Sequence, residues 1–298
     1  GPEMLYTRPD IYAWRAMDEQ AVCASYIGRK DEAFMLCRRI LAVPDLPDEE
    51  RVRIAINRDA LVQTMLDAAC RYPEAAVQSV RASPGEADLI VSLVAGPDRD
   101  STERALNSFL QCCTDLSRVG QFLAVDTGLS AHDRAILRDH YEFLNFVPPH
   151  PTDTPAAHFA YLRQCVDARF WLHLGEGWTF FAPENLITRL AAVLEAEPQV
   201  FQVGVNFADA VSQTGSCAAE AKVRRAPEAG RYVLTDTVAT GPAMFHTARL
   251  DHAGGLHGTD SITEPEPRAA IAGRHTATLD EVLCVDTLTL RGTSSSER

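Results

Sequence analysis

The acid Glu176 has the setting that most suggests chemistry, because it stands alone between Gly175 and Gly177. Residues 170–174 before it are mostly apolar and have the pattern of a buried strand, and Trp178 follows directly. Mg²⁺ and Mn²⁺ prefer oxygen ligands and commonly use carboxylates together with substrate phosphates. Because the turn holds a single acid, the sequence predicts a weak cation site at best.

A second acid, Asp126, also follows an expected strand, in the segment Val125-Asp126-Thr127-Gly128. An aspartate beside a glycine often bonds its own backbone in an Asx turn. From the residues alone, this structural role and a ligand-binding role for Asp126 both stay open.

From residue 87 onward the pattern alternates between strands and helices, which is typical of an α/β layer fold with a mainly parallel sheet. We expect strands at 87–95, 120–125, 141–147, 170–174 and 199–206, with helices near 131–140, 155–167 and 186–195. Residues 208–230 contain few apolar side chains and are expected to form a long surface loop or lid. Residues 292–298 should be a disordered tail.

Residues 4–84 are expected to be helical. The spacing of small and apolar residues predicts two antiparallel helices joined at Gly28-Arg29-Lys30, a hairpin of tetratricopeptide type. One such hairpin is not stable alone, so it should pack on its neighbour, and it could also bind a protein partner. Pro84-Gly85 marks the expected boundary with a second domain at 85–291.

The composition excludes some function classes. A formal charge of −13 over 298 residues argues against a nucleic-acid surface, which needs clustered Lys and Arg, and disfavours anionic membranes. No apolar run is long enough to span a bilayer, and no signal-peptide pattern is present. We therefore expect a cytoplasmic protein.

Five segments in order resemble nucleotide-sugar glycosyltransferases of family 2 with the GT-A fold. They are Ala105 to Asp115, Val125 to Ser130, Phe170 to Phe181, Gln202 to Phe207 and Ala272 to Asp280. The resemblance implies a mixed sheet flanked by helices, in a Rossmann-like arrangement. It also implies transfer of a sugar from a nucleotide-sugar donor to an unknown acceptor hydroxyl with inversion.

The resemblance also implies site residues. Asp126, Glu176 and Trp178 would contact the nucleotide. The family's metal-binding D-x-D motif is degenerate here, because Gly177 stands where the metal-binding aspartate is expected. Glu176 and Asp286, the latter at the place of a late family histidine, would be metal ligands. Mn²⁺ or Mg²⁺ would then be weakly bound or absent.

The acceptor base would be Glu264, with Glu266 as the second candidate. The alternative interpretation is that these two acids open a solvated helix, where the dipole favours them. Without a metal, the diphosphate charge could be offset by Arg224, Arg225 or His173.

Two further hypotheses stay open beside the transferase. The chain could be a catalytically inactive pseudo-glycosyltransferase that serves as a binding or scaffold protein. The site could also be remodelled for another reaction. The missing acids favour these alternatives, whereas Asp126, Glu176 and the two nearby tryptophans favour the enzyme.

Overall fold

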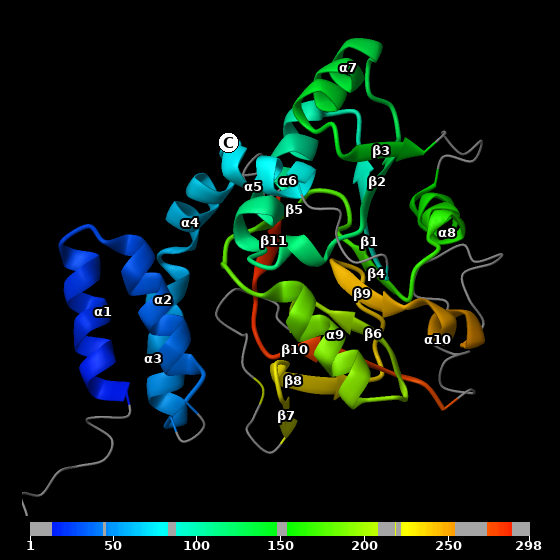
Figure 1. Cartoon of the computed structure of the whole chain (residues 1–298). Helices are drawn as coiled ribbons and strands as arrows, with labels where there is room; N and C mark the ends of the chain where they lie inside the picture. Colours follow the sequence, from blue (N-terminus) through cyan, green and yellow to red (C-terminus); the bar gives the residue numbers. More distant parts are fainter. Residues whose placement is uncertain are drawn as a thin grey trace, which may run out of the picture. The chain divides into compact units, whose positions relative to one another are not determined.

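The computed structural model describes residues 14–43, 46–82, 88–147, 154–207, 218, 222–253 and 273–287 (Figure 1). By their contacts, the described residues up to Ala68 form one compact unit and those from Ala69 form a second. The predicted tail at 292–298 lies outside the described residues.

The first unit is helical. It contains α1 (Ala16–Tyr26), α2 (Lys30–Leu41), α3 (Asp48–Asp59) and the start of α4 (Val62–Ala69). The predicted hairpin is confirmed as two helices: α1 and α2 pack together, and Gly28 turns the chain between them at a φ of 82°, a conformation that favours glycine. Its tetratricopeptide type stays a prediction. No helix in the described segments is both long and apolar enough to cross a bilayer.

The second unit contains a nine-stranded sheet in the order β3-β2-β1-β4-β9-β6-β10-β8-β7. The strands are β1 (Leu89–Ala95), β2 (Gln121–Asp126), β3 (Leu144–Val147), β4 (Phe170–His173), β6 (Val200–Gly204), β7 (Arg224–Ala226), β8 (Gly230–Thr235), β9 (Ala243–His246) and β10 (His275–Leu279). The mixed α/β architecture is confirmed. The mixed sheet is confirmed as well: β3, β2, β1 and β4 pair in parallel, as do β6 and β10, whereas β9 and β8 run antiparallel to both of their neighbours.

Helices cover both faces of the sheet. They are α5 (Glu74–Ala82), α6 (Arg99–Cys112), α7 (Ala131–His140), α8 (Pro155–Cys165), α9 (Leu186–Ala196) and α10 (Thr247–His252). Phe159 of α8 joins Leu123 of β2 and Leu250 of α10 in one buried cluster, whereas Phe109 of α6 packs edge-on against Phe122. Because neighbouring strand residues point to opposite faces, α6 lies across the sheet from α8.

The strand order reverses at β1. The chain first builds outward from β1 through β2 to β3, and then returns so that β4 pairs with β1 on its other side, parallel to it. Such a topological switch point leaves a crevice at the carboxyl ends of the strands, where ligands bind in open α/β sheets. This position of the crevice follows from the topology alone.

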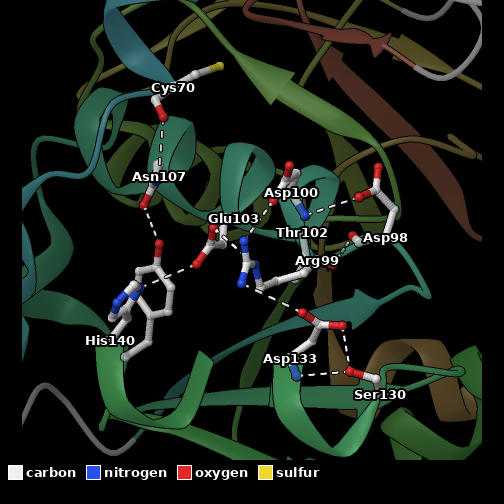
Figure 2. A network of polar contacts seen from close by, with 11 residues as sticks. Cys70, Asp98, Arg99, Asp100, Thr102, Glu103, Asn107, Ser130, Asp133 and His140 are labelled. Carbon is white, nitrogen blue, oxygen red and sulfur yellow. Dashed lines mark hydrogen bonds and ion pairs between the residues drawn. The ribbon is translucent and has the colours of Figure 1, made fainter. Parts of the chain in front are cut away.

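A polar network ties α6 to α7 (Figure 2). The Arg99 guanidinium lies 3.6 Å from carboxylate oxygens of both Glu103 and Asp133. At the start of α7 the Ser130 hydroxyl donates to Asp133 and accepts from its backbone N–H. At the other end His140 lies 3.3 Å from Glu103. The network fixes α7, the helix that follows the turn containing Asp126.

Several residues of the resemblance have framework roles. The Asn107 amide accepts from the Tyr141 hydroxyl at 2.6 Å and donates to the Cys70 carbonyl. Ser108 accepts from the Phe180 N–H at 2.9 Å. Asp115 accepts from the Ile187 and Thr188 N–H groups and so caps α9. These three side chains of the segment Ala105 to Asp115 therefore hold helices and strands together rather than contacting a ligand.

The predicted loop at 208–230 is partly wrong. Residues 208–217 and 219–221 lie outside the described segments, but β7 and β8 form a hairpin that begins at Arg224. Its turn uses two residues of positive φ, Glu228 at 63° and Gly230 at 67°. The sequence analysis missed this hairpin because β7 is short and carries two arginines.

A two-stranded sheet of β5 (Trp178–Phe180) and β11 (Cys284–Asp286) completes the unit. The Asn206 side chain holds β11 in place. Its amide donates to the Cys284 carbonyl at 2.8 Å and accepts from the Leu283 and Cys284 N–H groups at 2.9 and 3.2 Å. One side chain therefore satisfies three backbone groups that lie next to β5.

We predict that Asn206→Ala lowers the free energy of unfolding by about 2–4 kcal/mol, because it leaves three backbone groups without partners. Asn206→Asp should also destabilise, because a carboxylate cannot donate to the Cys284 carbonyl. Urea unfolding measures both. Asn145→Ala, at an exposed position, is the control, and it should lower the free energy of unfolding by less than about 1 kcal/mol. Equal costs at the two positions would contradict the role of Asn206.

Candidate functional site

A cavity of about 310 Å³ opens at the switch point, between the carboxyl ends of β1 and β4 and the amino end of β9. Its lining is mostly apolar with a few polar groups, as is usual for small-molecule sites. The described lining residues are Val94, Pro97, Thr127, His158, Phe159, His173, Gly175, Glu176, Ala239, Thr240, Gly241 and Phe245. Glu176 is the one carboxylate among them, and none is Lys or Arg.

The Trp178 indole sets the shape of the turn beside this cavity. A Cβ atom at Gly175 would lie 2.9 Å from the Trp178 Cδ1, and one at Gly241 would lie 2.7 Å from its Cζ2. The indole is therefore wedged between two glycines, which both line the cavity. Gly175 and Gly177 have φ values of 73° and 74°, so the backbone on both sides of Glu176 has a conformation that favours glycine.

Glu176 is exposed at the cavity, and its carboxylate has no hydrogen bond or ion pair to any described residue. A Cβ at Gly96 would lie 2.6 Å from its Oε1, so the carboxylate lies against the backbone that leaves β1. A carboxylate in this position can accept hydrogen bonds from a ligand.

His173 lines the cavity from the end of β4 and is part of a buried chain of hydrogen bonds. The Trp171 Nε1–H donates to the Ser92 Oγ at 2.7 Å, and the Ser92 Oγ lies 2.9 Å from the His173 Nδ1. The Phe159 ring packs edge-on against the imidazole, with centroids 4.9 Å apart. Burial lowers the pKa of His173 to about 3, so the imidazole is neutral near pH 7.

The opposite wall of the cavity is held by Gln202, which is fully buried on β6. Its amide donates to the Ala239 carbonyl at 2.8 Å and accepts from the Ala239 N–H at 2.9 Å. This pair of bonds fixes the segment that leads through Thr240 and Gly241 into β9.

The structure confirms the Asx turn at Asp126. Its Oδ1 accepts from the Gly128 and Leu129 N–H groups at 2.9 and 2.8 Å, and its Oδ2 pairs with the Arg134 guanidinium of α7. The Asp126 side chain is 7% exposed. Its neighbour Thr127, rather than Asp126, lines the cavity. Nucleotide contact by Asp126 stays a prediction.

The described donor set does not fit a divalent cation held by the protein alone. Among the described residues, no three His, Cys, Asp or Glu side chains are grouped so that they could hold a metal. Asp286 pairs with Trp178 across β11 and β5 and does not line the cavity. Gly177 supplies no ligand side chain. Mn²⁺ or Mg²⁺ would therefore depend on Glu176 and on ligand phosphates.

The other predicted site residues are scattered or undescribed. Glu264 and Glu266 lie outside the described residues. Arg224 is on the edge strand β7, where it pairs with Glu197 at 2.8 Å, and so is not available at the cavity. Arg225 is on the same strand. Of the three candidates for offsetting diphosphate charge, only His173 lines the cavity.

Ser92, Gln202 and Gly241 have roles at the site that were not predicted from the sequence. Ser92 had a visible signal, because it is the one polar residue in the apolar run of β1. Gln202 begins one of the five segments of the resemblance, but its role and that of Gly241 depend on residues far away in the sequence.

No family model matches the sequence, and no curated protein matches it either. Among solved structures, the mannosyltransferase PcManGT from Pyrobaculum calidifontis, in complex with GDP-Man and Mn²⁺, is similar with a TM-score of 0.52 and 14% identity, over 83% of this chain and 71% of that one. The chain has the GT-A-type fold. GalNAc-T7 with UDP, GalNAc and Mn²⁺ gives a TM-score of 0.49 and 9% identity, over 64% of this chain and 42% of that one. The chain thus spans under half the length of GalNAc-T7.

We predict that Gly241→Ala lowers the free energy of unfolding by about 1–3 kcal/mol, because the new methyl group meets the Trp178 ring. In a Trp178→Ala background the same substitution should cost much less. Urea unfolding of the four proteins of this double-mutant cycle measures the coupling. If the losses of unfolding free energy in the two single variants add up to the loss in the double variant within about 0.5 kcal/mol, the packing of Trp178 against Gly241 would be contradicted.

Stability should also depend on His173 and pH. The unfolded chain takes up a proton on this imidazole below about pH 6.5, whereas the native state resists protonation until the pH is near 3. Stability should therefore fall as the pH drops through this window, by up to ~1.4 kcal/mol per pH unit from this group. His173→Gln removes the group and should make the decline shallower in urea unfolding at about pH 7 and about pH 5. If the free energy of unfolding falls equally in the wild type and in His173→Gln between these two pH values, a buried, neutral His173 would be contradicted.

Proposed function

We propose that this chain is a glycosyltransferase-like protein that binds a nucleotide-sugar donor in the cavity between β1, β4 and β9. One observation carries the proposal: the Glu176 carboxylate, without a described partner, faces a cavity at the switch point of the sheet. The fold alone would not suffice, because one fold hosts many functions. The position of this carboxylate is the feature of the site itself that supports donor binding.

The chemistry of the lining suits a sugar ring. Glu176 can accept hydrogen bonds from hydroxyl groups, and the neutral His173 can form one as well. Phe159 and Phe245 offer apolar ring surface to the carbon skeleton. The lack of a described Lys or Arg in the lining disfavours a site built for phosphate alone.

The proposed reaction is an inverting transfer. The acceptor hydroxyl oxygen bonds to the anomeric carbon of the sugar while the bond from that carbon to the diphosphate oxygen breaks. The hydroxyl proton passes to a carboxylate, for which Glu264 is the first candidate and Glu266 the second. The nucleoside diphosphate leaves. The roles of these two glutamates rest on the sequence resemblance.

The proposed metal dependence is weak. Glu176 is the single described carboxylate at the cavity, and Asp286 is the second candidate ligand. A divalent cation, when bound, would supply charge neutralisation for the donor diphosphate. Glu176 itself would orient the donor in either case.

A second candidate function is binding without catalysis, as a pseudo-glycosyltransferase. Two observations favour it. The Asp126 carboxylate is already engaged by Arg134 and two backbone N–H groups, and glycine replaces the expected metal-binding acid at 177. The N-terminal helices would then serve a protein partner. Product formation, rather than binding, separates this candidate and a remodelled site from a working transferase.

Calorimetric titration with UDP, GDP and their common sugar conjugates, with and without Mn²⁺, tests the proposal. We expect one conjugate to bind with an affinity on the order of micromolar. Glu176→Gln should weaken its binding about tenfold or more, because it removes a charged acceptor. The matched control is Glu195→Gln on α9, an exposed acid that does not line the cavity and should bind as the wild type does. Failure of all nucleotides to bind would contradict the proposal.

A further inference from the structure

The hydroxyl of Ser92 determines which nitrogen of His173 carries the proton. Ser92 is fully buried, and its Oγ has two described partners. One is the Trp171 Nε1–H, which can only donate. The Ser92 hydroxyl proton therefore has one described acceptor left, the His173 Nδ1. With Nδ1 accepting, the proton of the neutral ring must be on Nε2.

The neighbouring side chains fix the orientation of the His173 imidazole ring. The Phe159 ring packs edge-on against the imidazole at 4.9 Å between centroids, and the Trp171 ring lies 5.7 Å away. Ser92 holds the Nδ1 edge. Only the edge with Nε2 remains for the cavity that His173 lines, and Nε2 has no hydrogen bond to any described residue.

We propose that His173 is a ligand-binding residue that presents a fixed, uncharged Nε2–H donor to an oxygen atom of the ligand in this cavity. The inference deepens the proposed function and rests on it. Ser92 and Trp171 act through His173 by fixing its tautomer, and Glu176 supplies the complementary acceptor on the same cavity. A site with one fixed donor and one carboxylate acceptor matches a hydroxyl group, which can accept from the first or donate to the second.

A donor of this kind differs from a charged one. A neutral imidazole buried among aromatic rings binds an uncharged oxygen without the cost of desolvating a cation. The proposed contact of His173 is the sugar portion of the donor, which carries the uncharged hydroxyl oxygens, and contact with the diphosphate is the outcome that would overturn it. Comparing the binding of a nucleotide with the binding of its sugar conjugate distinguishes contact with the diphosphate oxygens from contact with the sugar oxygens.

The first measurement is a ¹⁵N NMR spectrum of the histidine side chains of the full chain, assigned with His173→Gln. It needs no ligand. We expect the resonances of His173 to show the Nε2–H tautomer near pH 7. The Nδ1–H tautomer or a protonated ring would overturn the inference.

The second measurement is calorimetric titration of two variants with the best-binding conjugate and its parent nucleotide. The Gln amide reaches about as far as Nε2, whereas the shorter Asn amide reaches only about as far as Nδ1. His173→Asn should therefore lose about tenfold in affinity for the sugar conjugate, and His173→Gln should retain most of it. Neither variant should change binding of the nucleotide without its sugar.

The outcomes are distinguishable from failure of the proposed function. If the wild type binds no nucleotide sugar, the proposed function fails, and the ligand role of His173 falls with it. If the wild type binds and both variants bind equally well, the donor role of His173 is wrong while the proposed function stands. Equal loss in Asn and Gln, with the nucleotide affected as well, would show a merely structural role and would also overturn the inference.

Discussion

The position of the Trp178 indole between Gly175 and Gly241 is the constraint on which the site depends. Side chains at these two positions would meet the ring at 2.9 and 2.7 Å. The ring therefore requires a glycine where β4 leaves the sheet and another where the chain enters β9. Both of these strand ends border the cavity, so this packing contact helps to shape it.

This constraint accounts for the glycines on either side of Glu176. A turn with positive φ on both sides of one residue, packed against an indole, favours glycine over aspartate at 175 and 177. The two glycines are thus part of the packing arrangement of this turn. Glu176 remains as the carboxylate of this turn, directed at Gly96 and the cavity. For the proposed function, this arrangement favours ligand binding through shape and hydrogen bonding over binding through a cation.

Much of the fold could be predicted from the sequence, because the strands β1, β2, β4 and β6 are apolar runs and α7 has clear end signals. The antiparallel direction of β9 and the hairpin of β7 and β8 could not be predicted. Their pairing depends on partners more than thirty residues away or on a turn with a positive φ at Glu228. Strand direction is a tertiary property, and a short run of four residues does not encode it.

The residues of the candidate site were likewise only partly predictable from the sequence. Glu176 was visible because an acid between two glycines is locally unusual, and the Asx turn of Asp126 follows from its own neighbours. The pairing of Ser92 with His173 spans 81 residues and the Trp178 contact with Gly241 spans two separate elements, so neither had a local pattern. Residues that act through distant contacts are those that sequence reasoning misses.

In the proposed function, the cavity between β1, β4 and β9 holds the donor without requiring a divalent cation. The most direct test is a crystal structure of the full chain with a nucleotide sugar and with chelator in place of metal. We expect density for the sugar between His173 and Glu176, with Trp178 still packed against Gly175 and Gly241. Density at another surface, or density in this cavity only when Mn²⁺ is supplied, would contradict it.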